Sequence, residues 1–140
     1  MSSRRKARIL AFQALYAWNT SHISTEELLT FSWVEQEKLE KLDADARLFA
    51  AFLVKGTIEN IDIIDKKIQE HLKHWSIDRI QKIDLALLRI STYTLMFQKD
   101  IPFQIVIDEA VEIAKEFGTD ESYRFVNGVL DSIRKSLQNT

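Results

Sequence analysis

The chain has no cysteine, one proline and three glycines in 140 residues. The lack of cysteine excludes disulfides, thiolate metal sites and thiol nucleophiles, and it fits a reducing compartment such as the cytoplasm. Because turns between strands draw heavily on glycine and proline, their scarcity favours an all-α chain with short connections. No apolar run approaches the roughly 18–20 residues that cross a bilayer, and no apolar stretch typical of a signal peptide follows the N-terminus. We therefore expect an all-α cytoplasmic protein without a membrane segment.

Sequence signatures of catalysis are missing as well. The chain contains no phosphate-binding loop, nucleophile elbow or zinc-hydrolase motif. His71 and His74 lie three residues apart on a helical tract, but a metal site needs further ligands and supporting groups. We expect no enzymatic activity, no cofactor and no metal.

Apolar residues recur at three- and four-residue steps along nearly the whole chain, which indicates helices. We predict a bundle of about six or seven helices in a single domain over residues 1–140. Its N-terminal helical half covers about residues 1–72 and its C-terminal helical half about residues 76–140. The predicted helix starts are Ser2 or Ser3, Ser24 or Thr25, Asp43, Ser76, Pro102 and Asp120.

The same pattern predicts where helices break or continue. The second helix is expected to break around residues 31–33, and the tract from Asp43 is expected to continue through Leu72. A predicted turn lies at residues 99–100. Gly118 is the expected end of the helix that follows Pro102.

Positive charge is concentrated at the start of the chain. Arg4, Arg5, Lys6 and Arg8 give the first 25 residues a net charge of +4, because no acidic residue occurs before Glu26. Without these four cations the chain has 15 basic and 21 acidic residues, a net charge of −6. A cationic segment in an otherwise acidic protein is typical of a contact with a polyanion, most often nucleic acid.

Aromatic residues accompany the cations on the first predicted helix. At about 100° per residue, Arg5, Arg8, Phe12 and Tyr16 share one flank beside the apolar stripe. Guanidinium groups neutralise phosphates and aromatic rings stack on unpaired bases, so this flank suits single-stranded RNA. Two other interpretations remain open: Phe12 and Tyr16 pack in the core, or the arginines serve only solubility.

Three segments carry a resemblance to a known family. They are RRKARILAFQALYAW near the N-terminus, LALLRISTYTL in the middle, and IPFQIVIDEAVEIAKEFGTDESYRFVNGVLD towards the C-terminus. Together and in this order they resemble the NusB family of bacterial transcription antitermination factors. The similarity covers most of the chain and is weakest over residues 19–45. It implies the NusB fold, an all-helical structure of two small subdomains.

The resemblance also implies a function and partners. It implies an RNA-binding factor that pairs with NusE, itself a ribosomal protein, to bind boxA, a short single-stranded RNA element of ribosomal RNA operons. The bound pair would join elongating RNA polymerase with other Nus factors and suppress premature termination. The RNA-contacting positions that the resemblance implies are Arg4, Arg5, Lys6, Arg8, Gln13, Tyr16, Phe117, Asp120, Glu121 and Phe125. Asp84 and Arg89 match positions near the junction with NusE.

Lys6, Thr94 and Asp108 depart from the residues common in the family, which affects the fine RNA preference rather than the assignment.

Two other functions stay open from the residues alone. One is a non-catalytic interaction scaffold, or a homodimer that masks the basic helix. The other is an accessory RNA-binding module of an RNA-modifying system. RNA binding that weakens steeply with salt distinguishes an RNA-binding factor from a scaffold.

Overall fold

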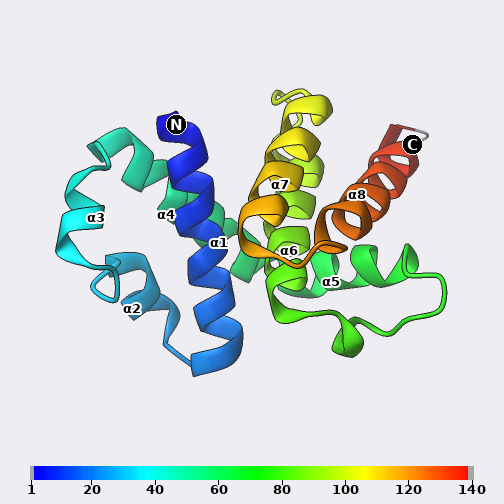
Figure 1. Cartoon of the computed structure of the whole chain (residues 1–140), viewed down its shortest axis with the longest axis horizontal. Coiled ribbons are helices and arrows are strands. Elements are labelled where there is room, and N and C mark those ends of the chain that lie inside the picture. Colours follow the sequence, from blue (N-terminus) through cyan, green and yellow to red (C-terminus); the bar gives the residue numbers. More distant parts are fainter. Residues whose placement is uncertain (1, 139–140) are drawn as a thin grey trace. The chain divides into compact units, whose positions relative to one another are not determined.

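The computed structural model describes residues 2–138, and its regular structure there is helical (Figure 1). The described residues contain eight α-helices, one 3₁₀ helix and no strand, which confirms the predicted all-α class with more helices than the six or seven expected. The elements are α1 (Ser3–Ser21), α2 (Thr25–Thr30), α3 (Gln36–Glu40), α4 (Ala44–Glu59), α5 (Ile61–Glu70), η1 (Ile77–Arg79), α6 (Lys82–Phe97), α7 (Phe103–Phe117) and α8 (Ser122–Gln138). None of these helices combines the length and the apolar character needed to span a bilayer.

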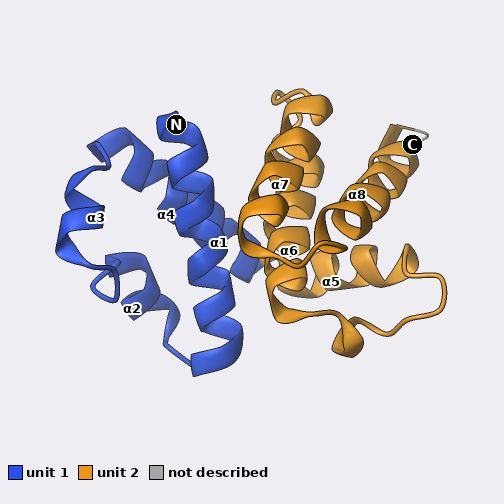
Figure 2. Cartoon of the chain, in the orientation of Figure 1, with its two compact units in different colours: residues 1–59 blue, residues 60–140 orange. Residues whose placement is uncertain are grey.

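The chain divides into two compact units, residues 1–59 and 60–140 (Figure 2). In the first unit α1 packs along α4, and α2 packs against both helices. In the second unit α6, α7 and α8 pack against one another, and α5 packs on α6 and α8. The sequence predicts an N-terminal half that ends at about residue 72. The compact units divide earlier, between Glu59 and Asn60, because the apolar side of α5 packs within the second unit.

Small residues set the packing of α1. Ser2 is its N-cap, and the Arg5 amide donates to Ser2 Oγ at 3.2 Å, as the sequence predicted. Alanines along the buried face let the α1 backbone approach α4 closely. The fully or nearly fully buried apolar residues of α1 are Ala7, Leu10, Ala11, Phe12, Ala14 and Leu15.

The predicted break after the second helix is confirmed. Ser24 caps α2, and Phe31 ends it in the left-handed region with φ of 55°. The Leu28 carbonyl at this end accepts from both the Phe31 amide at 3.1 Å and Trp33 Nε1 at 3.0 Å. Because these two donors satisfy a carbonyl at the helix end, α2 stops there and α3 starts separately.

The tract predicted to run unbroken over residues 43–72 is two helices. Asp43 caps α4 as expected, since its Oδ1 accepts from the Ala46 amide at 2.7 Å. The break lies at Asn60, whose φ of −113° and ψ of 21° leave the helical region. The Asn60 carbonyl then accepts from the Ile64 amide at 3.0 Å and starts α5. Apolar residues keep a helical spacing across this point, so the pattern alone did not reveal it.

The helix predicted from Ser76 begins later. Ser76 precedes only the short η1, and α6 starts at Lys82. Every residue of α6 from Asp84 to Leu95 is buried. A helix buried on all sides lies at the centre of its unit, and α6 contacts α5, α7 and α8.

The turn between α7 and α8 requires a glycine for space rather than for φ. Pro102 is the N-cap of α7 and Gly118 its C-cap, as predicted. Gly118 has φ of −95°, but a Cβ there would lie 2.5 Å from both Cβ and Oγ of Ser122. Asp120, predicted as a cap, lies two residues before α8, and the Glu121 carbonyl accepts from the Phe125 amide instead.

Candidate nucleic-acid interface

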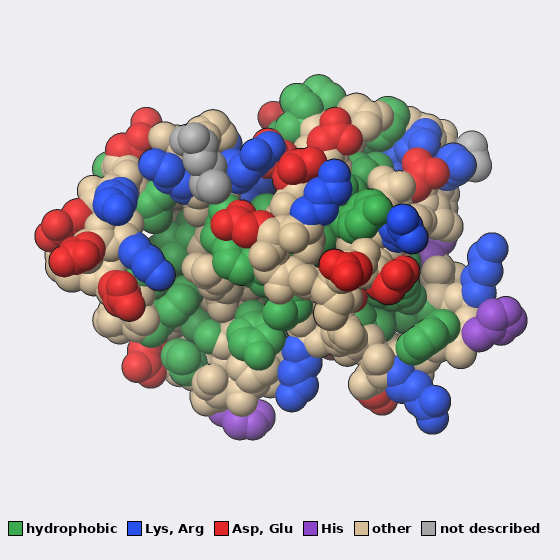
Figure 3. Space-filling view, viewed as in Figure 1, with side chains coloured by type: hydrophobic (Ala, Val, Ile, Leu, Met, Phe, Trp, Pro, Cys, Tyr) green, Lys and Arg blue, Asp and Glu red, His purple; other side chains and the backbone are tan. Residues whose placement is uncertain are grey.

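The four N-terminal cations occupy the first two turns of α1. No acidic residue lies in the first turn to oppose them. Free amides give a helix N-terminus a partial positive charge, so cations there are electrostatically unfavourable by roughly 0.3–1 kcal/mol each. Bound phosphate would relieve this repulsion and accept from the amides as well. Figure 3 shows Lys and Arg side chains gathered around the start of α1.

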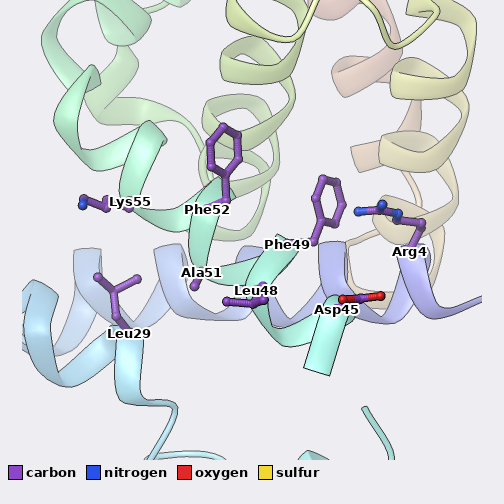
Figure 4. Close-up of a pocket in the computed structure, with 8 residues that line it drawn as sticks. All are labelled: Arg4, Leu29, Asp45, Leu48, Phe49, Ala51, Phe52 and Lys55. Atoms are coloured by element: carbon purple, nitrogen blue, oxygen red, sulfur yellow. The ribbon is translucent and has the colours of Figure 1, made fainter. Parts of the chain in front are cut away.

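An aromatic ring on α4 holds two of these cations. The guanidinium carbon of Arg4 lies 4.2 Å from the centroid of the Phe49 ring, and that of Arg8 lies 5.5 Å from it. Both distances are within the range of cation–π attraction. Figure 4 shows Arg4 and Phe49 pointing towards each other. Both residues line a surface cavity of about 610 Å³. The spacing along α1 did not reveal Phe49, because this ring comes from another helix.

Replacing Phe49 should weaken RNA binding by about two- to fivefold. Phe49→Leu removes the ring while keeping an apolar side chain, and cation–π attraction contributes about 0.5–1 kcal/mol at exposed sites. In the wild type the ring orders the Arg4 and Arg8 side chains before RNA binds. Without the ring, these side chains become ordered only on binding, and the loss of conformational entropy then lowers the affinity. Phe49→Tyr keeps a ring and is the matched control. Equal RNA affinities for the leucine and tyrosine variants, measured by fluorescence anisotropy, would contradict this role.

The exposure of the α1 residues separates surface groups from core groups. Arg4, Gln13 and Tyr16 are exposed, and Arg5, Lys6 and Arg8 are half-buried. The Tyr16 side chain keeps 39% of its surface exposed, which leaves its ring accessible to a base. The prediction that Phe12 belongs to the basic and aromatic flank is wrong. Its side chain is only 3% exposed and lies in the core.

The α7–α8 corner carries the other predicted RNA contacts. Asp120 and Glu121 are exposed, while Phe117 and Phe125 are half-buried. Buried Ser122 shapes this corner, because its Oγ accepts from the Thr119 amide at 2.9 Å. The corner borders a surface cleft of about 320 Å³. The residues that line the cleft are Lys115, Thr119, Asp120, Glu121, Tyr123 and Arg124.

The cleft contains two cations, Lys115 and Arg124, that the sequence did not indicate. Lys115 Nζ lies 5.3 Å and the guanidinium carbon of Arg124 lies 5.4 Å from the centroid of the Tyr123 ring. Arg124 Nε also donates to the Tyr123 hydroxyl at 3.1 Å. The corner therefore places an aromatic ring and two cations beside two carboxylates. Lys115 and Arg124 come from different helices, so no local motif joins them.

The two residues predicted at a partner junction are buried. Arg89 Nε and Nη2 donate to the two carboxylate oxygens of Asp65, both at 2.9 Å, which ties α6 to α5. Asp84 lies in α6, and among residues 2–138 its Oδ1 has no hydrogen-bond partner. Burial raises the pKa of the Asp84 carboxyl, and a hydrogen bond with Ser122 opposes that rise. Burial leaves both side chains little exposed surface, and the Arg89–Asp65 pair contributes to the fold, while a contact of either residue with a partner stays a prediction.

Asp84→Asn should stabilise the protein at neutral pH. The raised pKa means that the folded state holds a proton that the unfolded chain releases near its ordinary value of 3.8. Stability therefore falls as pH rises from about 3.8 through the folded-state pKa, and the full cost of burying the charge is present above it. Asparagine carries no charge to bury. Urea unfolding should give a more stable variant at pH 7 and a smaller difference at pH 3, whereas a pH-independent difference would contradict this explanation.

The family model described as the NusB family matches residues 5–135. This chain belongs to the NusB family. Among curated relatives, the transcription antitermination protein NusB of Treponema denticola is 54% identical over 94% of this chain and 95% of its own length. The NusB of Treponema pallidum is 50% identical over 95% of this chain and 93% of its own length. These relatives are named for transcription antitermination, which is a regulatory role and not an enzymatic activity.

Solved structures of NusB share this fold. T. maritima NusB is 39% identical with a TM-score of 0.84, covering 96% of this chain and 92% of its own. A chain from the crystal structure of antitermination factors NusB and NusE in complex with dsRNA is 32% identical. Its TM-score is 0.83, and the match covers 97% of this chain and 98% of that one. The predicted NusB-like architecture is therefore confirmed.

Proposed function

We propose that this protein pairs with NusE and binds single-stranded boxA RNA of ribosomal RNA operons. The bound pair joins elongating RNA polymerase and other Nus factors in the cytoplasm and suppresses premature termination. No bond is made or broken in this function. The protein acts by binding an RNA segment and a partner protein at the same time, which holds both near the polymerase.

The cationic start of α1 is the observation that carries the proposal. Four cations, a helix N-terminus and the ring of Phe49 lie together in a chain whose remaining charge is −6. Phosphates satisfy the first two features, because they carry negative charge and accept from both guanidinium groups and backbone amides. The Phe49 ring contributes by holding the guanidinium groups of Arg4 and Arg8 in place. An RNA strand presents such phosphates at regular spacing.

The comparisons support RNA and NusE as the partners. A NusB chain of the same fold, 32% identical to this one, forms the complex of NusB and NusE with dsRNA. Another chain with a TM-score of 0.88 and 32% identity comes from the crystal structure of a plectonemic RNA supercoil. These structures contain RNA, and our proposal extends RNA binding to this chain and names boxA as the target.

The proposed RNA contacts lie in both units. In the first unit Arg4, Arg5, Lys6 and Arg8 bind phosphates, Gln13 donates or accepts at a base edge, and Tyr16 stacks on a base. In the second unit Phe117 and Phe125 offer rings, and Asp120 and Glu121 accept from amino groups of bases. Carboxylates also repel phosphates, so these two favour base contact over backbone contact at the corner.

One titration tests the proposal. Fluorescein-labelled boxA RNA and a scrambled strand of equal length are titrated with the protein, with and without NusE, over a series of salt concentrations. We expect tighter binding to boxA than to the scrambled strand, and tighter binding with NusE present. The logarithm of affinity should fall with the logarithm of salt by about 0.7 for each phosphate contact. No preference for boxA and a flat salt response would instead favour an interaction scaffold or a homodimer.

A further inference from the structure

The loop between α5 and α6 is fixed to its unit at both ends. Leu72 and Ile80 are buried, whereas residues 73–76 and 78–79 between them are exposed. At the start of the loop, His71 Nδ1 and Ser132 Oγ of α8 lie 2.7 Å apart in a hydrogen bond. The loop therefore has a defined base, and its exposed residues are presented from fixed points.

One glutamine holds the middle of this loop. Gln69 Nε2 donates to the Trp75 carbonyl at 2.9 Å, and Gln69 Oε1 accepts from the Ile77 amide at 2.8 Å. One side chain thus forms hydrogen bonds with the backbone on both sides of Ser76, and we call this pair of bonds the Gln69 clamp. The clamp fixes the backbone of Trp75, while the Trp75 side chain faces solvent.

Trp75 is 57% exposed, although tryptophan has the largest side chain of the apolar residue types. Exposing an indole forgoes hydrophobic stabilisation that burial would supply. Tryptophan is also the residue type most strongly enriched where binding energy concentrates. An exposed indole on a clamped loop is therefore better explained as a binding group than as a packing group.

Cations accompany the indole. Residues 71–82 contain Lys73, Arg79 and Lys82 but only one acidic residue, Asp78. Without this segment and the four cations of α1, the chain has 12 basic and 20 acidic residues, a net charge of −8. Lys73, Arg79 and Lys82 are exposed. Figure 3 shows Lys or Arg, His and hydrophobic side chains gathered over the loop that follows α5.

We propose that this loop is a second contact for single-stranded RNA, with Trp75 as a stacking platform and Lys73, Arg79 and Lys82 as phosphate contacts. The inference rests on the proposed RNA-binding function and adds a site outside α1 and the α7–α8 corner. An exposed ring among cations matches unpaired nucleotides, because each base offers a face for stacking and each phosphate a charge. A protein partner would instead favour an apolar surface depleted of lysine.

The experiment uses the full chain and fluorescein-labelled boxA RNA with single-stranded flanks. Trp75→Ala should weaken binding by about fivefold or more, the low end of the loss reported by alanine substitution at base-stacking rings. Trp75→Phe keeps a ring and should bind nearly as well as the wild type. Phe97→Ala is the matched control, since Phe97 is another exposed ring of the same unit and should leave RNA affinity unchanged.

Tryptophan fluorescence gives a second, direct readout. RNA that stacks on the indole should quench the wild-type emission, and Trp75→Phe should lose this quenching while still binding. Thermal melting of each variant verifies that it folds. The Lys73→Gln and Lys82→Gln double variant should reduce the salt slope by about 1.4, because each lost phosphate contact removes about 0.7.

Each outcome separates this inference from the proposed function. If the wild type binds RNA and Trp75→Ala binds equally well, the second contact is overturned and the proposed function stands. If the wild type binds no RNA, with or without NusE, both fail. If Trp75→Ala weakens only the complex that contains NusE and leaves binding to RNA alone unchanged, the indole contacts a protein and the inference is overturned.

Discussion

Replacing Arg4, Arg5, Lys6 and Arg8 together with glutamine should reduce the affinity for boxA RNA by on the order of 100- to 1,000-fold at about 0.1 M salt. Each single-strand phosphate contact contributes a salt dependence of about −0.7, which is roughly a fivefold gain in affinity at that salt concentration. The gains in affinity from four such contacts multiply, which gives the expected range of 100- to 1,000-fold. The salt slope itself should become shallower by about 2.8. Fluorescence anisotropy titrations between about 0.05 and 0.5 M salt measure both quantities.

The control for this experiment is a set of cations elsewhere on the same unit. Lys38 and Lys41 are exposed and lie outside the start of α1 and the cavity beside Phe49. Their replacement with glutamine should leave both the affinity and the slope nearly unchanged. Thermal melting verifies that the four-residue variant folds, since it loses the contacts of Arg4 and Arg8 with Phe49 but also removes cations from a helix N-terminus. A variant that unfolds, or one that binds RNA as well as the wild type, would contradict an RNA-binding role for this segment.

Arg89→Ala should destabilise the protein by about 3 kcal/mol, the lower end of the range for breaking a buried ion pair. The substitution removes both donors to Asp65 and leaves that carboxylate poorly solvated between α5 and α6. Asp65 keeps part of its side chain in contact with water, which is why we take the lower end of the range. Urea unfolding monitored by circular dichroism measures the free energy of unfolding.

A double replacement tests whether the lost pair causes this effect. Arg89→Met with Asp65→Leu removes both charges and keeps the volume, so it should recover most of the stability. Lys55 and Glu59 form an exposed pair at 4.0 Å, and Lys55→Ala should change stability by less than about 0.5 kcal/mol. A double variant no more stable than Arg89→Ala would show that Arg89 stabilises the unit by other contacts than the ion pair.

Local signals in the sequence were enough to predict much of the fold. Ser2, Ser24 and Asp43 cap helices where the pattern of small polar residues placed them, because a cap is made within four residues of chain. The break after α2 was also local. The break at Asn60 was not predicted, since the apolar spacing continues through it and only packing against α6 and α8 distinguishes α5. Likewise, Ser76 has the residue type of a cap, yet the chain forms η1 and a turn there before α6 begins.

The candidate interface was predicted in part for the same reason. The cations of α1 and the exposed Tyr16 follow from one helix, and periodicity places them together. Phe12 lies at the edge of the apolar stripe, where a helical wheel does not decide between core and surface. Phe49, Lys115 and Arg124 contribute through contacts between helices, and no spacing along the chain encodes such contacts.

The first turns of α1 and α4 lie at the same end of their unit. Ser3 Oγ donates to Asp43 Oδ2 at 3.4 Å, and Asp43 caps α4 with its other oxygen. Two positive helix ends and the cations of α1 therefore meet near two carboxylates, those of Asp43 and Asp45. Added electrolyte screens the repulsion among these cations as well as their attraction for phosphates. A rise in ionic strength therefore relieves the repulsion within the unbound protein and lowers its affinity for RNA.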